Sequence, residues 1–233
     1  MANSTMTTIQ SEKSLGVIGG MGPEATVDFM QKLVEATPAE VDQDHIETIV
    51  YNDPKIPDRN RAILEGTESP LPRLKENLKE LEQVGAQVIA MPCNTAHYYF
   101  DDLEQEATTQ FINMVRRTRG RLEESNISST GLLATKTVIE ADVYSKEFAD
   151  SNVELVEPVD KNALMDCIYD IKRQNYQSAQ NSLDKVVTEF RDEGIDSLVI
   201  ACTDLGILDF KSDLKTFDST SILAESCVQE VRA

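Results

Sequence analysis

The chain has 233 residues, enough for one large domain or two small ones, and its 40% apolar and 27% charged residues are typical of a globular protein. Its formal net charge of −19 disfavours binding to nucleic-acid phosphates, and no apolar stretch is long enough to predict a membrane span. Residues 1–14 are polar and lack the apolar run of a secretory signal, so we expect a flexible extension and a cytoplasmic protein.

The first half of the chain alternates short apolar runs with helical patterns. The expected strands are 15–20, 46–51 and 88–91; the expected helices are 25–36 and 71–84, and 52–60 is expected to be a loop. The glycines at 19, 20 and 22 lack the spacing of phosphate-binding motifs. They predict a tight turn, or a close approach of the backbone to a small ligand.

The second half repeats this alternation. The expected strands are 130–134, 153–156 and 197–201, and the expected helices are 135–148, 163–172, 177–191 and 222–231. Strands that alternate with helices predict an α/β fold with mostly parallel sheets.

A weak internal repeat relates the two halves. Residues 87–95 resemble 197–204, which places Cys93 and Cys202 at equivalent positions, 109 residues apart. We therefore predict two similar α/β halves of about 100 residues, related by a pseudo-twofold axis. Parallel sheets bind ligands at the carboxyl ends of their strands, so the two cysteines are expected on opposite sides of one cleft.

The chemistry of two facing thiols depends on whether they are reactive. A lone cysteine after a strand is commonly packed core, but the matched positions of Cys93 and Cys202 favour a functional pair. One thiolate acting as base and one thiol acting as acid suit proton exchange at a bound carbon. Cys167 and Cys227 lie within helical patterns and are expected to be core residues.

A nucleophilic cysteine hydrolase is the competing chemistry, and it would usually need a histidine beside the thiol. His97 follows Cys93 by four residues, but we interpret it as a helix-surface or capping residue. The absence of CxxC spacing, with only two histidines, argues against a structural zinc site. Arg59, Lys172 and Arg173 are the cations that could bind a carboxylate.

Several stretches resemble one family. These are LGVIGGMGPEAT at 15–26, NDPKIPDR at 52–59, MPCNTAH at 91–97, residues 132–148 and ACTD at 201–204. They are similar to the aspartate/glutamate racemases that use no pyridoxal phosphate, and most closely to the aspartate racemase branch. The resemblance implies two α/β domains with four-stranded parallel sheets, an active site between them, no cofactor and a homodimer. The implied domains are 15–108, with a helix returning from 219–233, and 109–218.

The resemblance also implies roles for individual residues. The catalytic pair falls on Cys93 and Cys202. Substrate binding falls on Met21, Arg59, Asn94, Thr95, Thr203 and Lys172, with Arg173 replacing Lys172 when the count starts from Ile168 and Tyr169. Asp204 has a supporting role, and it stands where glutamate racemases typically have a histidine, which favours the aspartate branch. Thr137 stands where the family often has a glycine.

The sequence thus predicts a racemase that interconverts L- and D-aspartate without metal or cofactor. Its partner would be a small acidic amino acid, with no nucleic acid and no membrane. The alternatives are a glutamate or broad-specificity amino-acid racemase, a decarboxylase or isomerase of a small diacid, and a non-catalytic small-acid binding protein.

Overall fold

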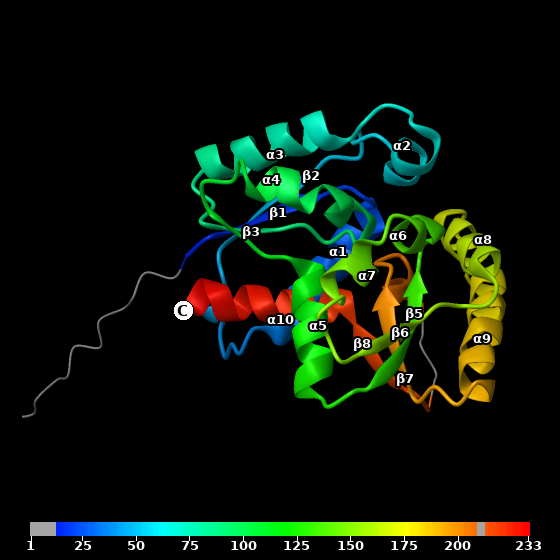
Figure 1. Cartoon of the computed structure of the whole chain (residues 1–233). Coiled ribbons are helices and arrows are strands. Elements are labelled where there is room, and N and C mark those ends of the chain that lie inside the picture. The colour runs from blue at the N-terminus through cyan, green and yellow to red at the C-terminus, as the bar shows by residue number, and fades with distance from the viewer. Residues whose placement is uncertain (1–12, 209–212) are drawn as a thin grey trace, which may run out of the picture.

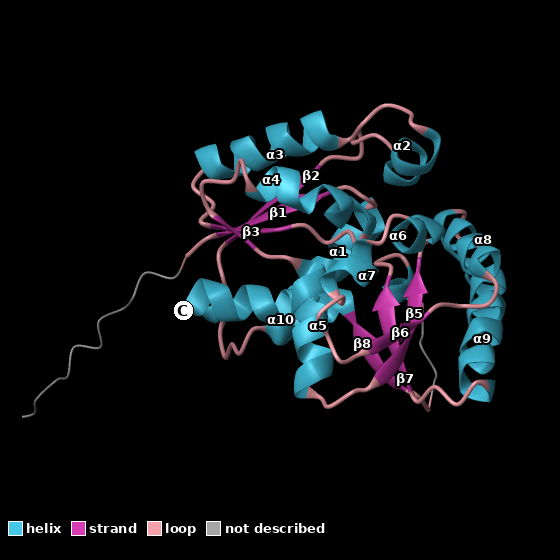
Figure 2. Ribbon diagram, in the orientation of Figure 1, coloured by secondary structure: helices cyan, strands magenta, loops and turns pink. Residues whose placement is uncertain are grey.

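Two parallel four-stranded sheets organise the molecule, which we describe from a computed structural model for residues 13–208 and 213–233 (Figures 1 and 2). The strand orders are β2-β1-β3-β4 and β6-β5-β7-β8, so each half places its first strand between its second and third. This repeat and the flanking helices confirm the predicted α/β fold. No helix of the described residues is long and apolar enough to cross a membrane.

The first half contains the sheet with Cys93. Its strands are β1 (Leu15–Gly19), β2 (Thr48–Asn52), β3 (Val88–Ala90) and β4 (Gln110–Phe111). Its helices are α1 (Pro23–Ala36), α2 (Arg59–Glu65), α3 (Leu71–Gln83) and α4 (Phe100–Glu104), with 3₁₀ turns η1 (Asp42–Asp44) and η2 (Thr95–Tyr99).

The second half contains the sheet with Cys202. Its strands are β5 (Ser129–Ala134), β6 (Glu154–Val156), β7 (Ser197–Ala201) and β8 (Lys215–Asp218). Its helices are α5 (Met114–Glu124), α6 (Lys136–Glu140), α7 (Val143–Glu147), α8 (Lys161–Lys172) and α9 (Tyr176–Asp192), with the 3₁₀ turn η3 (Leu205–Ile207). The final helix is α10 (Ser219–Arg232).

Both faces of the first sheet are buried, as continuous apolar strands predict. Leu15 and Val17 point toward α1 and α10, whereas Ile18 points toward α3 and α4. Figure 1 shows α10 and α1 beneath the first sheet and α3 above it. The first sheet therefore receives one covering helix from the far end of the chain.

The second sheet is covered by α8 and α9 on one face, and by α6, α7 and part of α10 on the other. The sequence pattern at 135–148 predicts one helix, and this prediction is wrong. The segment forms the two short helices α6 and α7, because Asp142 between them adopts a left-handed conformation with φ of 56°.

The expected limits of the first domain, at residue 108 and residue 219, lie next to β4 and at the start of α10, and residues 13 and 14 contact this half. The first sheet continues to Phe111 in β4, and α10 begins at Ser219. Lys13 donates its backbone N–H to Val231, and the Ser14 hydroxyl donates to Gly85. The rest of the expected extension, residues 1–12, lies outside the described residues.

The glycine turn after β1 serves packing within the protein. Gly20 has φ of 94°, and a Cβ there would lie 2.3 Å from the backbone carbon of Asp53. The close approach expected of this turn is therefore made by the segment after β2. Gly22 faces the other half of the molecule, where Asp204 is the nearest neighbour of a Cβ at that position.

Candidate active site

The first cysteine turn follows β3. Cys93 is 5% exposed, and His97 of η2 is buried beside it. His97 Nδ1 lies 2.9 Å from the carbonyl oxygen of Cys93, and its Nε2 accepts the backbone N–H of Met114 at 3.0 Å. Since Nε2 is an acceptor, Nδ1 carries the proton and donates to Cys93.

His97 is buried, so the prediction of a helix-surface residue is wrong, but the prediction of a capping residue is confirmed. Met114 is the first residue of α5, and its backbone N–H has no partner within that helix. Burial lowers the pKa of His97 to about 4, so the imidazole is neutral near pH 7. Both ring nitrogens are occupied by backbone groups, so His97 has no nitrogen left to activate the Cys93 thiol. This geometry removes the main support for a cysteine–histidine hydrolase.

Asn94 links the Cys93 turn to the second half. Its Oδ1 accepts from the hydroxyl of Tyr144 at 2.7 Å, and its Nδ2 donates to Ser219 Oγ at 3.1 Å. Ser219 in turn donates to the carbonyl of Ile200 in β7. One N–H of Asn94 Nδ2 is left for a ligand, because Nδ2 carries two hydrogens. Thr95 contacts Thr135 across the halves, with 3.3 Å between the hydroxyl oxygens.

The second cysteine turn follows β7 and is charged. Cys202 is 5% exposed, and Asp204 forms an ion pair with Lys172 at 2.7 Å. Burial raises the pKa of the Cys202 thiol, and the Asp204 carboxylate raises it further. The backbone N–H groups of Asp204 and Leu205 and the Lys172 ammonium act in the opposite direction but do not outweigh burial.

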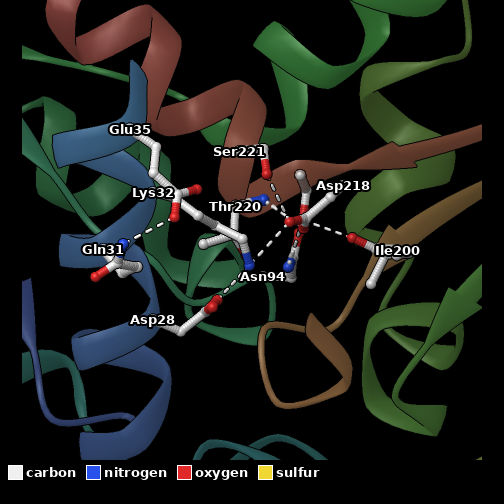
Figure 3. Close-up of polar contacts among 10 residues, drawn as sticks. Asp28, Gln31, Lys32, Glu35, Asn94, Ile200, Asp218, Thr220 and Ser221 are labelled. Carbon is white, nitrogen blue, oxygen red and sulfur yellow. Dashed lines mark hydrogen bonds and ion pairs between the residues drawn. The ribbon is translucent and has the colours of Figure 1, made fainter. Parts of the chain in front are cut away.

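A cluster of three charged side chains, Asp28, Lys32 and Asp218, lies beside the segment that follows Cys202 (Figure 3). Lys32 of α1 lies between Asp28 and Asp218, with 3.0 Å to the Asp218 carboxylate. Asp218 also caps α10 by accepting the backbone N–H of Thr220. The cluster lies against Gly206 of η3, where a Cβ would come within 3.0 Å of Lys32 Nζ. The cluster therefore joins α1, α10 and the turn that carries Cys202.

Arg59 begins α2 rather than lying in the expected loop, and its guanidinium is held by backbone carbonyls. Nη1 donates to Pro57 at 3.1 Å and to Ile56 at 3.4 Å, and Nη2 donates to Met21 at 3.2 Å. Arg59 forms no ion pair within residues 13–208 and 213–233, and its Nε is buried without a hydrogen-bond partner. Nε and the second hydrogen of Nη2 therefore remain as a pair of donors.

These residues line one small cavity between the halves. Its volume is about 40 Å³, and the sequence-predicted residues that line it are Met21, Arg59, Cys93, Asn94, Thr95, Lys172, Cys202, Thr203 and Asp204. Arg173 is absent from this lining, whereas Lys172 is present. Of the two cations, Lys172 is therefore the one that borders the cavity, and its role as a substrate contact stays a prediction.

Four further lining residues are absent from the sequence prediction. They are Asp58, Asn60, Thr135 and Ile168. Asn60 directly follows Arg59, and Thr135 directly follows the second-half equivalent of β1, so adjacency to an assigned motif was the available signal. Cys167 and Cys227 are fully buried in the core, as predicted.

A larger surface groove of about 400 Å³ lies elsewhere, between α5 and α10. Its four arginines are paired with glutamates: Arg116, Arg117, Arg119 and Arg121. We place the candidate site at the smaller cavity, where two thiols and an arginine without a carboxylate partner converge. Within the described residues, no group of three or more His, Cys, Asp or Glu side chains is arranged to hold a metal ion.

The fold and this cavity define a class of protein: two similar parallel-sheet halves, each contributing one cysteine from the carboxyl end of its third strand. The model of the family Asp/Glu/Hydantoin racemase matches residues 18–227, and the chain belongs to this family.

Individual relatives agree with this assignment. The structure of Picrophilus torridus aspartate racemase is 35% identical, covers 94% of both chains and gives a TM-score of 0.87. An aspartate racemase homologue from Pyrococcus horikoshii OT3 is 26% identical, with 95% of this chain and 100% of that chain covered and a TM-score of 0.76. The broad specificity amino-acid racemase RacX of Bacillus subtilis (strain 168) is 27% identical over 231 residues, which cover 92% of this chain and 96% of the relative.

Proposed function

We propose that this protein interconverts the enantiomers of an acidic amino acid, with aspartate as the main substrate, and that Cys93 and Cys202 exchange the Cα proton. The observation that carries the proposal is the convergence of two buried thiols, one from each sheet, on one cavity that also contains Arg59. Neither thiol has a histidine positioned to make it a conventional nucleophile.

The proposed reaction neither consumes nor releases a net proton. The thiolate of one cysteine removes the Cα proton and becomes a thiol, while the thiol of the other donates a proton to the opposite face and becomes a thiolate. Each turnover leaves the pair with exchanged protonation states, so the two cysteines then either act on the opposite enantiomer or exchange protons with water before they repeat the same conversion. For Cys202 to act first as base, its raised pKa must be overcome, which Lys172 and the two backbone N–H groups assist.

Removing a Cα proton places negative charge on the α-carboxylate, which the site has to stabilise. The remaining N–H of Asn94 and the hydroxyls of Thr95 and Thr203 are the donors we assign to this group. Arg59 offers its two remaining donors to the side-chain carboxylate. Its positive charge also offsets the repulsion that a net charge of −19 exerts on an acidic substrate.

The substrate cannot enter the cavity in its present form. A volume of about 40 Å³ holds at most a few water molecules, and an amino acid is larger. Groups that line the cavity therefore have to move to admit the substrate, and we propose that the two halves move apart. The contacts between Thr95 and Thr135 and between Asn94 and Tyr144 cross this boundary and are the ones we expect to change.

The second candidate is a racemase of broader specificity, which is favoured by the name of the Bacillus relative. Arg59 distinguishes the two candidates, because an arginine without an internal carboxylate partner is suited to a second substrate carboxylate. We therefore expect aspartate to be preferred over neutral amino acids of similar size.

The test is incubation of each enantiomer of aspartate, glutamate and alanine in deuterated water without added pyridoxal phosphate. Chiral chromatography and mass spectrometry then report inversion and deuterium at Cα. Inversion of aspartate with one deuterium supports the proposal. Faster inversion of alanine favours the broad-specificity candidate, and binding without any exchange favours a non-catalytic binding protein.

A further inference from the structure

One hydrogen-bond acceptor that lines the cavity has no role in the proposed proton exchange. Asn60 is the second residue of α2, directly after Arg59, and both residues line the cavity with the two thiols. Asn60 Oδ1 is buried and has no hydrogen-bond partner. A buried acceptor without a donor costs free energy, so its position inside a ligand cavity calls for a partner in the ligand.

Three other side-chain oxygens of the cavity residues already have donors. Asn94 Oδ1 accepts from Tyr144, and Asp204 Oδ2 accepts from Lys172. Asp58 Oδ1 accepts the backbone N–H of Arg61 at 2.9 Å and caps α2. Asn60 Oδ1 differs from these three oxygens because its acceptor capacity is wholly available to a bound molecule.

An α-amino acid near neutral pH has one strong donor group. Its carboxylates are acceptors only, so its ammonium alone can satisfy an unpaired oxygen. The donors of the cavity, such as Arg59 Nε, match the carboxylates in the complementary way. Adjacent residues of α2 thus offer one donor and one acceptor to groups of opposite character.

We infer that Asn60 accepts a hydrogen bond from the substrate ammonium and so distinguishes an amino acid from the corresponding diacid. This inference rests on the proposed function, because it assumes an acidic amino acid in this cavity. Recognition of the ammonium by Asn60 and of a carboxylate by Arg59 would fix the substrate at two points on one helix and limit its rotation between the thiols.

The test is a double-mutant cycle between protein and ligand. The protein change is Asn60→Leu, which has similar volume and no acceptor; the ligand change is aspartate to succinate, which lacks the ammonium. Dissociation constants are measured by competition or calorimetry at equilibrium. A hydrogen bond to a charged group is worth roughly a 10- to 100-fold change in affinity. We expect Asn60→Leu to weaken aspartate by about this factor and to change succinate less than about twofold.

The chain offers a matched control. Asn162 is also the second residue of a helix, α8, and is also preceded by an aspartate cap, but it is exposed and outside the cavity. Asn162→Leu should leave both affinities unchanged. Asn60→Leu overturns the inference if it weakens aspartate and succinate equally, or if it weakens neither.

Failure of the inference can be told apart from failure of the proposed function. The wild-type protein is assayed in parallel for deuterium incorporation at Cα of aspartate and glutamate. If exchange occurs and the cycle shows no coupling, the function stands and the role of Asn60 is wrong. If the wild-type protein neither exchanges nor binds these amino acids, both proposals are wrong. If glutamate is the substrate, glutamate and glutarate replace the ligand pair.

Discussion

The two cysteine turns occupy equivalent places in their sheets but are held by different forces. Neutral hydrogen bonds hold the Cys93 turn, through His97 to the backbone and through Asn94 to Tyr144 and Ser219. Ion pairs hold the Cys202 turn, between Lys172 and Asp204 on one side and in the Lys32 cluster on the other. The two cysteine turns thus follow equivalent strands, but different polar contacts hold each turn in place.

This difference has consequences for how the two turns respond to solution conditions. A buried neutral network depends on complete pairing and is insensitive to salt. Ion pairs with partly exposed side chains are screened by salt and depend on pH. We therefore expect the two halves of one site to be weakened by different treatments.

The largest expected effect tests whether the thiols are equivalent. Cys93→Ala and Cys202→Ala should each reduce racemisation by at least about 100- to 10,000-fold, because each removes one acid–base group. Chiral chromatography of both enantiomers measures the loss. Cys93→Ser and Cys202→Ser should differ in which enantiomer still exchanges Cα hydrogen. Near-normal racemisation by Cys202→Ala would show that the two-base mechanism is wrong.

The second prediction concerns the neutral support of the first turn. Burial lowers the pKa of His97 to about 4, so in the range between 4 and 6.5 the unfolded chain binds the proton and the folded chain does not. Stability is therefore complete above about pH 6.5 and falls as the pH decreases toward 4, by about 3 kcal/mol in total from this group.

Urea unfolding of the wild type and of His97→Gln at several pH values tests this. The variant should lose this part of the pH dependence, and it should also be less stable at pH 7 because Met114 N–H and the Cys93 carbonyl lose their partner. His45→Gln is the control for loss of a histidine. An identical pH dependence in His97→Gln and wild type would contradict the prediction.

The third prediction separates the two cations of the cavity. Arg59→Ala should reduce kcat/KM for aspartate by roughly 10- to 100-fold, since a bidentate contact to the substrate is lost. Lys172→Ala should reduce activity for a second reason, because it leaves the Asp204 carboxylate unpaired and this carboxylate repels an acidic substrate. Adding Asp204→Asn to the Lys172→Ala variant should therefore restore part of the lost activity. Equal loss for aspartate and alanine in Arg59→Ala, or no recovery in the Lys172 double variant, would contradict this division.

The smallest expected effect concerns the ionic support behind the second turn. Lys32→Met leaves Asp28 and Asp218 without their shared cation, and the side chains are only 16–20% exposed. The expected loss of stability is about 1–2 kcal/mol, between the values for exposed and buried pairs. Lys79→Met, which removes an exposed 3.7 Å ion pair, is the control and should cost less. Equal losses in the two variants would argue against the cluster as a support.

The sequence predicts the central strands of both sheets better than the edge strands β4 and β8 and the helix α5. Buried strands such as 88–91 and 197–201 carry strong apolar signals, and the repeat within them is visible in the chain. The two-residue strand β4 and the polar strand β8 carry little periodicity, and α5 is rich in arginine, so none of the three was predicted. Their assignment depends on pairing with β3 and β7 and on packing against α10, which no local pattern encodes.

In the candidate site, too, the residues within motifs could be predicted and the contacts made by the tertiary structure could not. The predicted residues from Met21 to Asp204 line one cavity, although their roles stay predictions. The orientation of His97 could not be predicted, because it depends on the backbone of Met114, which is distant in the sequence. Asn60 and Thr135 are adjacent to assigned motifs, but adjacency does not show that their side chains line the cavity, which depends on how the two halves face one another.

The return of α10 to the first half sets the order in which the protein can be completed during synthesis. Leu15, Val17 and Phe29 share an apolar cluster with Leu223 and Cys227 of this helix. The ribosome makes the first sheet early, but only α1 covers this face until α10 has left the exit tunnel. The half that is translated first is therefore completed last, and nascent chains whose α10 has not emerged present part of an apolar face to chaperones.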